Sequence, residues 1–588
     1  MKIIFPPKFK FQNNYHKSLL TLGSITVLSL LVYGFFVPFL GFYWDDWLLR
    51  YVFHIQGVQG IIDSQIYDRP FNSIFLLLGF LTFGESALLW QTGAVLVRIL
   101  LCFSFYWFIR LTWPNHKQAF LPLSLLFCFY PGFSQLPLAI AYFTWQLALV
   151  FILLSFVYQH FADLARSKLQ ATLLIVQSLI FTIFGWLIME IMLPFELMRL
   201  LISVQKYWSQ KLTWQKKLLK ICSRLWPFWL SSLSYAYWRF VIFNNLRQET
   251  QINSLFDSSK TSAHYFANIF ILGLDYLQTL LFAWFIPLIV RVLSLPVQTS
   301  LFFFLISFFI TIIFWFTISK LTGKKNIFSL TANKSWTQTI FLLGSLSSLG
   351  LLLPVALSNK VIVFTLDPDR YALLISPAII LALSGLIGSL FSLKSQHLIV
   401  GSLLFLSIFF QFENGAFMAR NWQQQQQLFD ELKINSPNIA PRSSVIINTK
   451  SLQRILSDYE LWVPLNLLYY PETKQPQIFA ASIISPFWAN EATTLQINVS
   501  QRNIEFSSEL KQVLVVTPAT NTDKLSTQTL SFSETIDLRD NPICETAKQH
   551  LHAAKKANSA SLALLETYSA LKLKLKLYFL SEFCPIQL

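Results

Sequence analysis

Two adjacent aspartates, Asp45 and Asp46, lie between Trp44 and Trp47 in the stretch GFYWDDWLLR, directly after a long apolar run. Carboxylates near a hydrocarbon layer are costly to desolvate, and neighbouring carboxylates repel each other. The pair therefore needs cations, a ligand or a reaction to offset it. A carboxylate in such a place can orient and deprotonate a hydroxyl nucleophile.

Three further short stretches carry charged groups that we expect at the same membrane face. Arg69 lies in YDRPFN, Glu190 lies in MEIMLPFELMR, and Arg370 and Tyr371 lie in LDPDRYALLISP. A guanidinium can bind a phosphate through two parallel hydrogen bonds. Together with the aspartates, this composition suits a hydroxyl nucleophile on one side and a phosphate leaving group on the other.

Several of these residues also have a structural interpretation. Trp44 and Trp47 are typical of the aromatic belt at a membrane interface. Arg69, just before a proline, could end an interfacial helix and extend its charge to the headgroups, and Arg370 could be an interfacial anchor.

Other ionisable residues lie inside apolar stretches. Glu190 could form a structural bridge with Arg199 instead of belonging to a site. Arg98 and Asp275 lie within apolar segments, so each is either a functional group or a buried, hydrogen-bonded helix contact.

The elements that position these residues are membrane helices. The chain has 588 residues, of which 54% are hydrophobic and 13% charged, and its mean hydropathy is +0.51. Apolar stretches of about 17–25 residues, the length that crosses a bilayer, recur from about residue 18 to 414. We expect a polytopic α-helical membrane protein with about 11–13 spans. The net charge of +16 falls mostly in short loops, which argues against a nucleic-acid partner.

The basic loops also predict the topology. The first span, 19–40, places the N-terminus in the cytoplasm and opens an external loop, 41–87, in which 71–84 is an interfacial helix. The next crossings are predicted at 88–109, 118–133, 136–158, 171–189 and 192–205. Late crossings are predicted at 336–358, 372–393 and 397–413. The three apolar stretches between these groups (225–243, 263–293 and 299–319) connect two cytoplasmic loops, so one of the three must be interfacial, re-entrant or split.

The sequence pattern of residues 415–588 differs from that of the transmembrane domain, 1–414. Short β-branched runs in 443–449, 495–500 and 512–518 predict strands, and 541–557 predicts a helix. We therefore expect a mixed α/β domain on the external face, with the glutamines 423–427 on an exposed helix face. Cys544 and Cys584 should form a disulfide if that compartment is oxidising, or else stay as two buried thiols.

The order of these motifs resembles the GT-C superfamily of integral membrane glycosyltransferases, among them protein O-mannosyltransferases and bacterial relatives. The resemblance covers about 1–414. It consists of an acidic pair after the first span, RPFNSIFLLLGFLTFG later in the long first loop, many spans, and an Arg-Tyr pair before a late span. It implies an inverting transfer of a sugar from a polyprenyl-phosphate carrier to an acceptor hydroxyl of a lipid, glycan or protein.

The resemblance also implies roles for residues. Asp45 or Asp46 would be the catalytic base, and Arg370 would stabilise the polyprenyl-phosphate leaving group, with Arg69 as a second candidate. Glu190 and Tyr371 would complete the substrate-binding set. Some members bind a divalent metal at the acidic motif and others do not, so the resemblance implies either. The expected location is a bacterial plasma membrane, with an endoplasmic reticulum membrane as the alternative.

Two other classes of function fit the same composition. One is a transporter or flippase of lipid-linked sugars, which would more often show internal repeats with interrupted spans in matching halves. We find no repeat in the sequence. The other is a non-catalytic envelope assembly protein, in which Asp45 and Asp46 would be dispensable.

Overall fold

The structure is a computed structural model that divides into two compact units. It describes residues 15–208, 210–243, 262–322, 328, 330, 333–358, 360–364, 369–447, 449, 452, 454–455, 457–482, 496–501, 504–509, 512–517 and 526–531. Met1–Gly41 and Gln65–Ala419 form the helical unit, and Phe42–Ser64 and Arg420–Leu588 form the sheet unit. The predicted disulfide of Cys544 and Cys584 and the predicted helix 541–557 lie outside the described residues.

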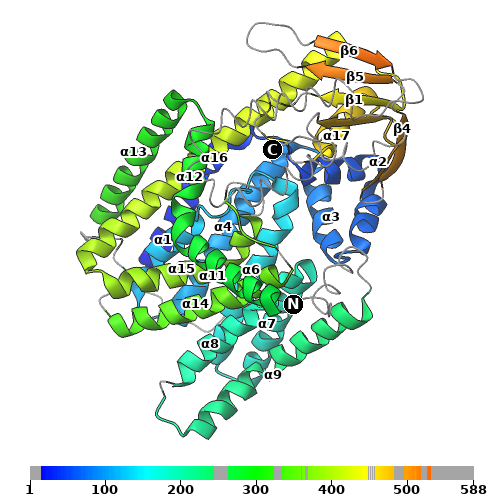
Figure 1. Cartoon of the computed structure of the whole chain (residues 1–588). Helices are drawn as coiled ribbons and strands as arrows, with labels where there is room; N and C mark the ends of the chain where they lie inside the picture. The colour runs from blue at the N-terminus through cyan, green and yellow to red at the C-terminus, as the bar shows by residue number, and fades with distance from the viewer. Residues whose placement is uncertain are drawn as a thin grey trace. The chain divides into compact units, whose positions relative to one another are not determined.

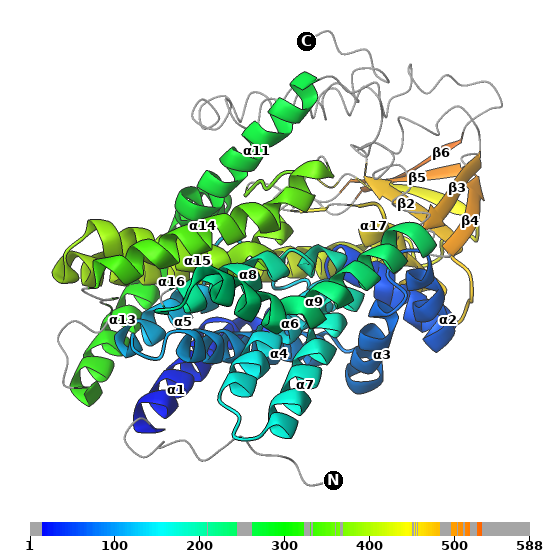
Figure 2. The ribbon, with the colours of Figure 1, turned by 90° about the horizontal axis from the view of Figure 1, so that it is seen from below.

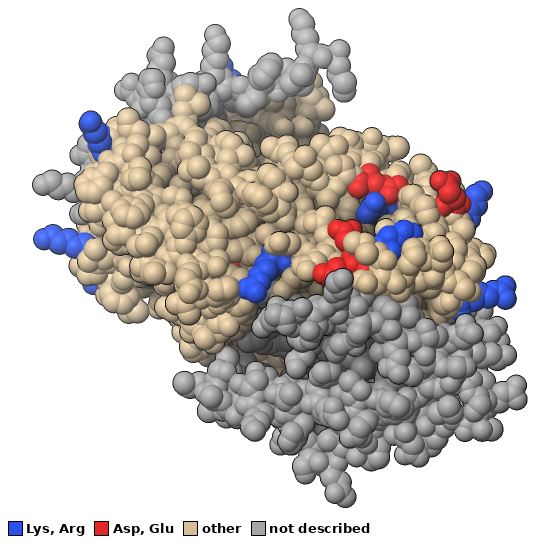
Figure 3. Space-filling model, turned by 90° about the horizontal axis from the view of Figure 1, so that it is seen from above, with Lys and Arg blue, Asp and Glu red and all other residues tan. Residues whose placement is uncertain are grey.

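The helical unit contains the long apolar helices (Figure 1). In the part of the chain that the structure describes, eight helices are long and apolar enough to cross a membrane. They are α1 with the following 3₁₀ turn (span Ser18–Phe39), α4 (Ala87–Thr112), α6 (Ala139–Asp163), α7 (Lys168–Ile188), α13 (Val297–Thr322), α14 (Lys334–Leu357), α15 (Arg370–Leu390) and α16 (Leu393–Asn435). The prediction of a polytopic helical membrane protein is confirmed at this level, and much of the face drawn in Figure 3 carries neither acidic nor basic side chains.

The count of long apolar helices is smaller than the predicted 11–13 spans for identifiable reasons. The predicted crossings 118–133 and 192–205 are the short helices α5 (Phe120–Cys128) and α8 (Phe195–Trp208). Helix α9 (Trp214–Tyr237) begins with a basic segment. The predicted short helix after Arg69 is α3 (Asn72–Phe83).

One of the three ambiguous stretches is broken. Residues 263–293 divide into α11 (Ser262–Leu281) and α12 (Ile286–Ser294), and this helix pair is bent by 53°. Pro287 lies in the first turn of α12, where its missing N–H costs no helical hydrogen bond. If the bent pair is counted as one span, the described residues contain up to nine spans.

Helix α5 ends deep within the helical unit, and Arg98 of α4 caps its end. Arg98 is 2% exposed, and its guanidinium donates to the carbonyl oxygens of Phe127 at 3.0 Å and Cys128 at 2.7 Å. The last carbonyls of a helix lack partners within the helix and attract positive charge. Arg98 is therefore a buried helix contact, which is one of the two interpretations that the sequence left open.

The chain after α5 is irregular and buried, so its backbone polar groups need partners from side chains. Asp369 accepts hydrogen bonds from the Ser134 backbone N–H at 2.8 Å and the Gln135 side chain at 2.6 Å. Asn414 donates to the Ser134 carbonyl at 2.7 Å, and Gln91 donates to the Pro137 carbonyl at 2.6 Å. Asp369 is 1% exposed, so it stabilises this segment from inside the protein.

Helices α14 and α15 pack backbone against backbone, side by side in Figures 1 and 2. A Cβ atom on Gly344 would lie 2.3 Å from the backbone nitrogen of Ala382, and one on Gly385 would lie 2.4 Å from that of Phe341. Small residues allow this close approach between membrane helices.

Replacing Gly344 by alanine should therefore lower the free energy of unfolding by about 1–3 kcal/mol, because the methyl group would push the α15 backbone away. The measurement is thermal unfolding of the purified protein in detergent. Gly23→Ala is the matched control, since apart from the adjacent backbone of its own helix no atom lies within 4 Å of its Cβ position. A Gly344→Ala protein as stable as the control would show that α14 and α15 can separate at little cost.

The sheet unit contains a mixed sheet in the order β2–β1–β5–β6. Strands β2 (Ile478–Ser482), β1 (Ser443–Ile447) and β5 (Gln512–Thr517) are parallel, and β6 (Ser526–Ser531) is antiparallel to β5. Strands β3 (Gln496–Gln501) and β4 (Ile504–Glu509) form a separate antiparallel pair. The three predicted strands correspond to β1, β3 and β5.

Helices complete the described part of the sheet unit. Helix α17 (Tyr459–Tyr469) packs on β2. The first part of α2 (Asp45–Ile66) and the end of α16 also belong to this unit. The α2 backbone changes direction at Gly57, whose φ of 61° favours glycine.

Candidate functional site

The predicted catalytic pair begins helix α2 in the sheet unit. Asp45 and Asp46 occupy the first turn, where the partial positive charge of the helix end favours carboxylates. Asp45 is half-buried and Asp46 is fully buried, at 0% exposed. Only Asp45 of the two is therefore open to a substrate in this conformation.

Helix α17 positions the backbone and side chains around Asp45. The Tyr459 hydroxyl donates to Asp45 Oδ1 at 2.5 Å. The Trp44 backbone N–H donates to Glu460 Oε1 at 2.9 Å, and the Trp44 indole donates to Ser457 Oγ at 3.2 Å. Burial, and then the Asp45 carboxylate, raise the pKa of Tyr459 above its ordinary value. Tyr459 therefore stays protonated and keeps donating to Asp45.

Trp47 lies inside the protein and is not part of an aromatic belt, which corrects the simpler interpretation of the tryptophans. It is 5% exposed, its indole donates to Gln425 Oε1 at 3.2 Å, and its ring packs 5.8 Å from that of Trp422. Gln425 is 1% exposed. The glutamine run is thus only partly on an exposed helix face, because Gln425 faces the inside of the sheet unit.

Arg69 and Glu190 form a two-pronged ion pair in the helical unit. Arg69 Nε and Nη2 each donate to a Glu190 oxygen at 3.0 Å. Arg239, in the π-helical turn Trp238–Ile242 that follows α9, lies 3.7 Å from Glu190, and Asp68 lies 3.7 Å from Arg69. Arg69 therefore does not extend to headgroups as a lone cation, and the partner of Glu190 is Arg69 rather than Arg199.

The electrostatics of this cluster keep it charged. Burial alone would raise the pKa of Glu190, but Arg69 and then Arg239 lower it to about 2. Burial would lower the pKa of Arg69, but Glu190, Asp68 and Tyr371 raise it above its ordinary value. Glu190 is therefore a poor proton acceptor at neutral pH. Its carboxylate instead holds Arg69 and Arg239 by charge.

Replacing Glu190 by glutamine should lower the free energy of unfolding by about 1–3 kcal/mol, because Arg69 and Arg239 lose their shared anion. The loss is smaller than for a fully buried pair because the Arg69 and Glu190 side chains are 24% and 17% exposed. Because the pKa is depressed, this stabilisation is present above the ordinary value of 4.5 and is lost as the pH falls through about 2.

Denaturant unfolding of wild type and Glu190→Gln at several pH values measures this effect. The difference in free energy of unfolding between the two proteins should be constant from pH 5 to 8 and should become smaller only in acid. A difference that changed between pH 5 and 8 would contradict the assignment of a permanently ionised Glu190.

Arg370 and Tyr371 begin α15 and extend the same cluster. The Arg370 guanidinium lies 5.2 Å from the centroid of the Tyr371 ring and interacts electrostatically with Tyr142. Tyr371 also interacts electrostatically with Arg69, and its ring centroid lies 6.2 Å from that of Trp145. The structure thus connects Arg69, Glu190, Arg370 and Tyr371 within the helical unit, while Asp45 and Asp46 belong to the sheet unit.

The side chains of this cluster are of the kinds that bind phosphate and sugar groups in proteins. Guanidinium groups bind phosphate oxygens, and an indole or phenol offers a flat apolar face to a sugar ring. Trp145 and Tyr371 are both half-buried. In the described residues, no group of three or more His, Cys, Asp or Glu side chains is placed to hold a metal ion.

The sequence interpretation missed several members of these clusters. Arg239, Tyr142 and Trp145 lie in or beside apolar helices, and nothing in their local sequence separates them from ordinary membrane residues. Tyr459 and Glu460 lie more than four hundred residues from Asp45 along the chain. Only the fold brings them together.

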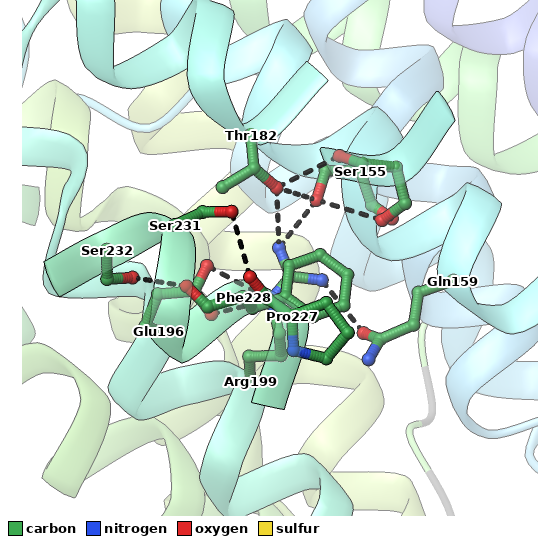
Figure 4. Close-up of polar contacts among 10 residues, drawn as sticks. Ser155, Gln159, Thr182, Glu196, Arg199, Pro227, Phe228, Ser231 and Ser232 are labelled. Carbon is green, nitrogen blue, oxygen red and sulfur yellow. Dashed lines mark hydrogen bonds and ion pairs between the residues drawn. The ribbon is translucent and has the colours of Figure 1, made fainter. Parts of the chain in front are cut away.

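Two other intramembrane ionisable residues have structural partners. Asp275, on α11, accepts from the Ile362 backbone N–H at 3.2 Å, which is a buried hydrogen bond to the irregular chain after α14. Arg199 lies in a polar network that links α6, α7 and α8, and its guanidinium packs against the Phe228 ring of α9 (Figure 4). It donates to Glu196 at 2.9 Å, to Gln159 at 2.8 Å and to Ser155 at 2.5 Å.

Comparisons with protein family models, with characterised proteins and with solved structures found no match to this chain.

Proposed function

We propose that this chain is an inverting glycosyltransferase that moves a sugar from a polyprenyl-phosphate carrier to an acceptor hydroxyl. One observation carries the proposal. The residues predicted from three distant stretches as a substrate-binding set form one chain of contacts within the helical unit, in the order Glu190, Arg69, Tyr371 and Arg370. A GT-C-like helical region and the glycosyltransferase activity are both part of this proposal.

Each residue has a defined task in the proposed reaction. Arg370 and Arg69 bind the carrier phosphate and stabilise the negative charge that develops as the bond from the anomeric carbon to the phosphate oxygen breaks. Glu190 holds Arg69 in place. The acceptor oxygen forms the new bond to the anomeric carbon, and its proton passes to a carboxylate. We assign that carboxylate to Asp45, because Asp46 is 0% exposed.

The proposed location is a plasma membrane, with the N-terminus in the cytoplasm and residues 415–588 outside. The basic loops support this orientation. In this scheme α13 connects opposite faces, and α9 must also cross, although its basic first turns keep it out of the eight long apolar helices. The bent pair α11–α12 must then contribute an even number of crossings, so we assign it as re-entrant and not as a single span.

A transporter or flippase of lipid-linked sugars is the second candidate. The bent pair α11–α12 favours it, since broken helices are common at transporter binding sites. The first candidate is preferred because the sequence shows no repeat that would provide a matching broken helix.

The test is transfer of radiolabelled sugar from a panel of polyprenyl-phosphate sugars, in membranes that contain the chain and in matched membranes that lack it. We expect one donor to give labelled, chain-dependent product, with release of polyprenyl phosphate in equal amount. Absence of transfer from every donor, together with chain-dependent movement of lipid-linked sugar across the bilayer, would reject the enzyme in favour of the transporter.

A further inference from the structure

The chain around the turn between α8 and α9 forms a basic tip, which we define as residues 206–208 and 210–220. It lies at the lower edge of Figure 1. Along the chain it is at the opposite ends of α8 and α9 from Glu190 and Arg239. The tip carries Lys206, Lys211, Lys216, Lys217 and Lys220, and Arg224 follows one helical turn later. The proposed function makes no use of these residues.

The charge of the basic tip is only partly neutralised within the protein. Asp163, at the end of α6, binds Lys206 at 2.7 Å and also pairs with Arg224. In the described part of the chain, no carboxylate lies within ion-pair distance of the four other lysines. Lys217 instead donates to the Trp208 carbonyl at 2.8 Å, and Lys220 donates to the Gln210 side chain at 3.3 Å. Four positive charges thus remain for a partner of opposite charge.

Aromatic side chains surround these lysines. Trp208 is 59% exposed and Trp214 is 64% exposed. The Lys217 ammonium lies 5.3 Å from the centroid of the Trp208 ring. Farther along α9, Trp226 is 57% exposed and Leu230 is 57% exposed, so an apolar surface continues directly from the basic tip.

We propose that the basic tip binds the headgroups of anionic phospholipids in the adjacent membrane leaflet. Clustered lysines attract anionic lipid surfaces, and exposed indoles prefer the headgroup region at the edge of the hydrocarbon. The exposed apolar residues of α9 would contact the acyl chains below the same headgroups. A soluble anion would use the lysines but would leave these indoles and leucines in water.

The experiment is native mass spectrometry of the delipidated full chain, titrated with phosphatidylglycerol or phosphatidylcholine. The wild type should prefer phosphatidylglycerol. In a variant with Lys211, Lys216, Lys217 and Lys220 replaced by glutamine, affinity for phosphatidylglycerol should fall about tenfold or more, since each lysine near an anionic surface contributes measurably. Replacement of the same four by arginine should keep the preference.

A matched control removes four exposed lysines that lie at the ends of other helices: Lys117, Lys320, Lys334 and Lys394. This control has the same net charge as the glutamine variant and should keep the wild-type preference. An equal loss in the control, or no lipid preference in the wild type, would overturn the proposal. So would equally tight binding of soluble glycerophosphoglycerol, because the lysines would then serve a soluble anion.

Discussion

Replacing Asp45 by asparagine should lower the rate of sugar transfer about 10³-fold, within the 10²–10⁴ range that a positioned general base contributes. Asparagine has nearly the same shape and can still accept the hydrogen bond from Tyr459, so the start of α2 should keep its geometry. It cannot accept the proton of the acceptor hydroxyl. The expected signature is a reduced kcat with an unchanged KM for the polyprenyl-phosphate donor, whose proposed phosphate-binding residues belong to the helical unit.

Two further variants separate catalysis from structure. Asp46→Asn should leave kcat within a few-fold of wild type, because Asp46 is 0% exposed. Its expected cost is about 0.3–1 kcal/mol of stability at the start of α2. Tyr459→Phe should lower kcat about tenfold, since one hydrogen bond that orients Asp45 is lost. All rates are compared at equal protein levels in the membrane.

The opposite ranking of the aspartates would reject the assignment of the base to Asp45. If Asp46→Asn were inactive and stable while Asp45→Asn stayed active, the buried residue would have to become exposed during turnover. Full activity in both variants would favour transport or a non-catalytic assembly role.

Sequence patterns predicted the long helices because a bilayer imposes a simple requirement. Twenty or so apolar residues in one run have few alternatives to a membrane helix. The same patterns failed at 118–133, where the helix ends at Cys128. Pro131 and Gly132 mark a break at that point, but hydropathy alone does not reveal that irregular backbone can be buried when Arg98, Asp369 and Asn414 supply its hydrogen bonds.

The candidate site was predictable only in part, for a related reason. Arg69, Glu190, Arg370 and Tyr371 stand out as polar residues at the ends of apolar runs, which is a local signal. Their pairing is not local. Sequence spacing suggested Arg199 as a partner for Glu190. In the structure, Arg199 pairs with Glu196, one helical turn away on α8, and Glu190 pairs with Arg69.

Replacing Arg199 by methionine should lower the free energy of unfolding by about 3–5 kcal/mol, the cost of removing one partner of a buried ion pair. Arg199 is 1% exposed, and its guanidinium lies between the rings of Phe156 and Phe228, at 4.3 Å and 4.0 Å from their centroids. Without it, the Glu196 carboxylate would remain in an apolar, largely buried position with no cation (Figure 4).

The network predicts which second change restores stability. Ser155 and Thr182 already hydrogen-bond each other at 2.6 Å, so they keep a partner after Arg199 is removed. The Glu196 carboxylate would lose its ion-pair partner. Arg199→Met combined with Glu196→Met should therefore recover most of the lost stability, because an apolar pair of similar volume replaces a charged pair. Arg199→Lys should be intermediate, since an ammonium cannot reach Glu196, Gln159 and Ser155 together.

Thermal and denaturant unfolding in detergent measure these differences in the free energy of unfolding. Sugar transfer by the double variant then decides whether the Arg199 network has a structural or a functional role. A double variant that is stable and active would assign Arg199 a structural role in joining four helices. A double variant that is stable but inactive would show that the charge itself is needed for activity. Wild-type stability in Arg199→Met alone would contradict the buried pair, because an isolated carboxylate in that position cannot be free of cost.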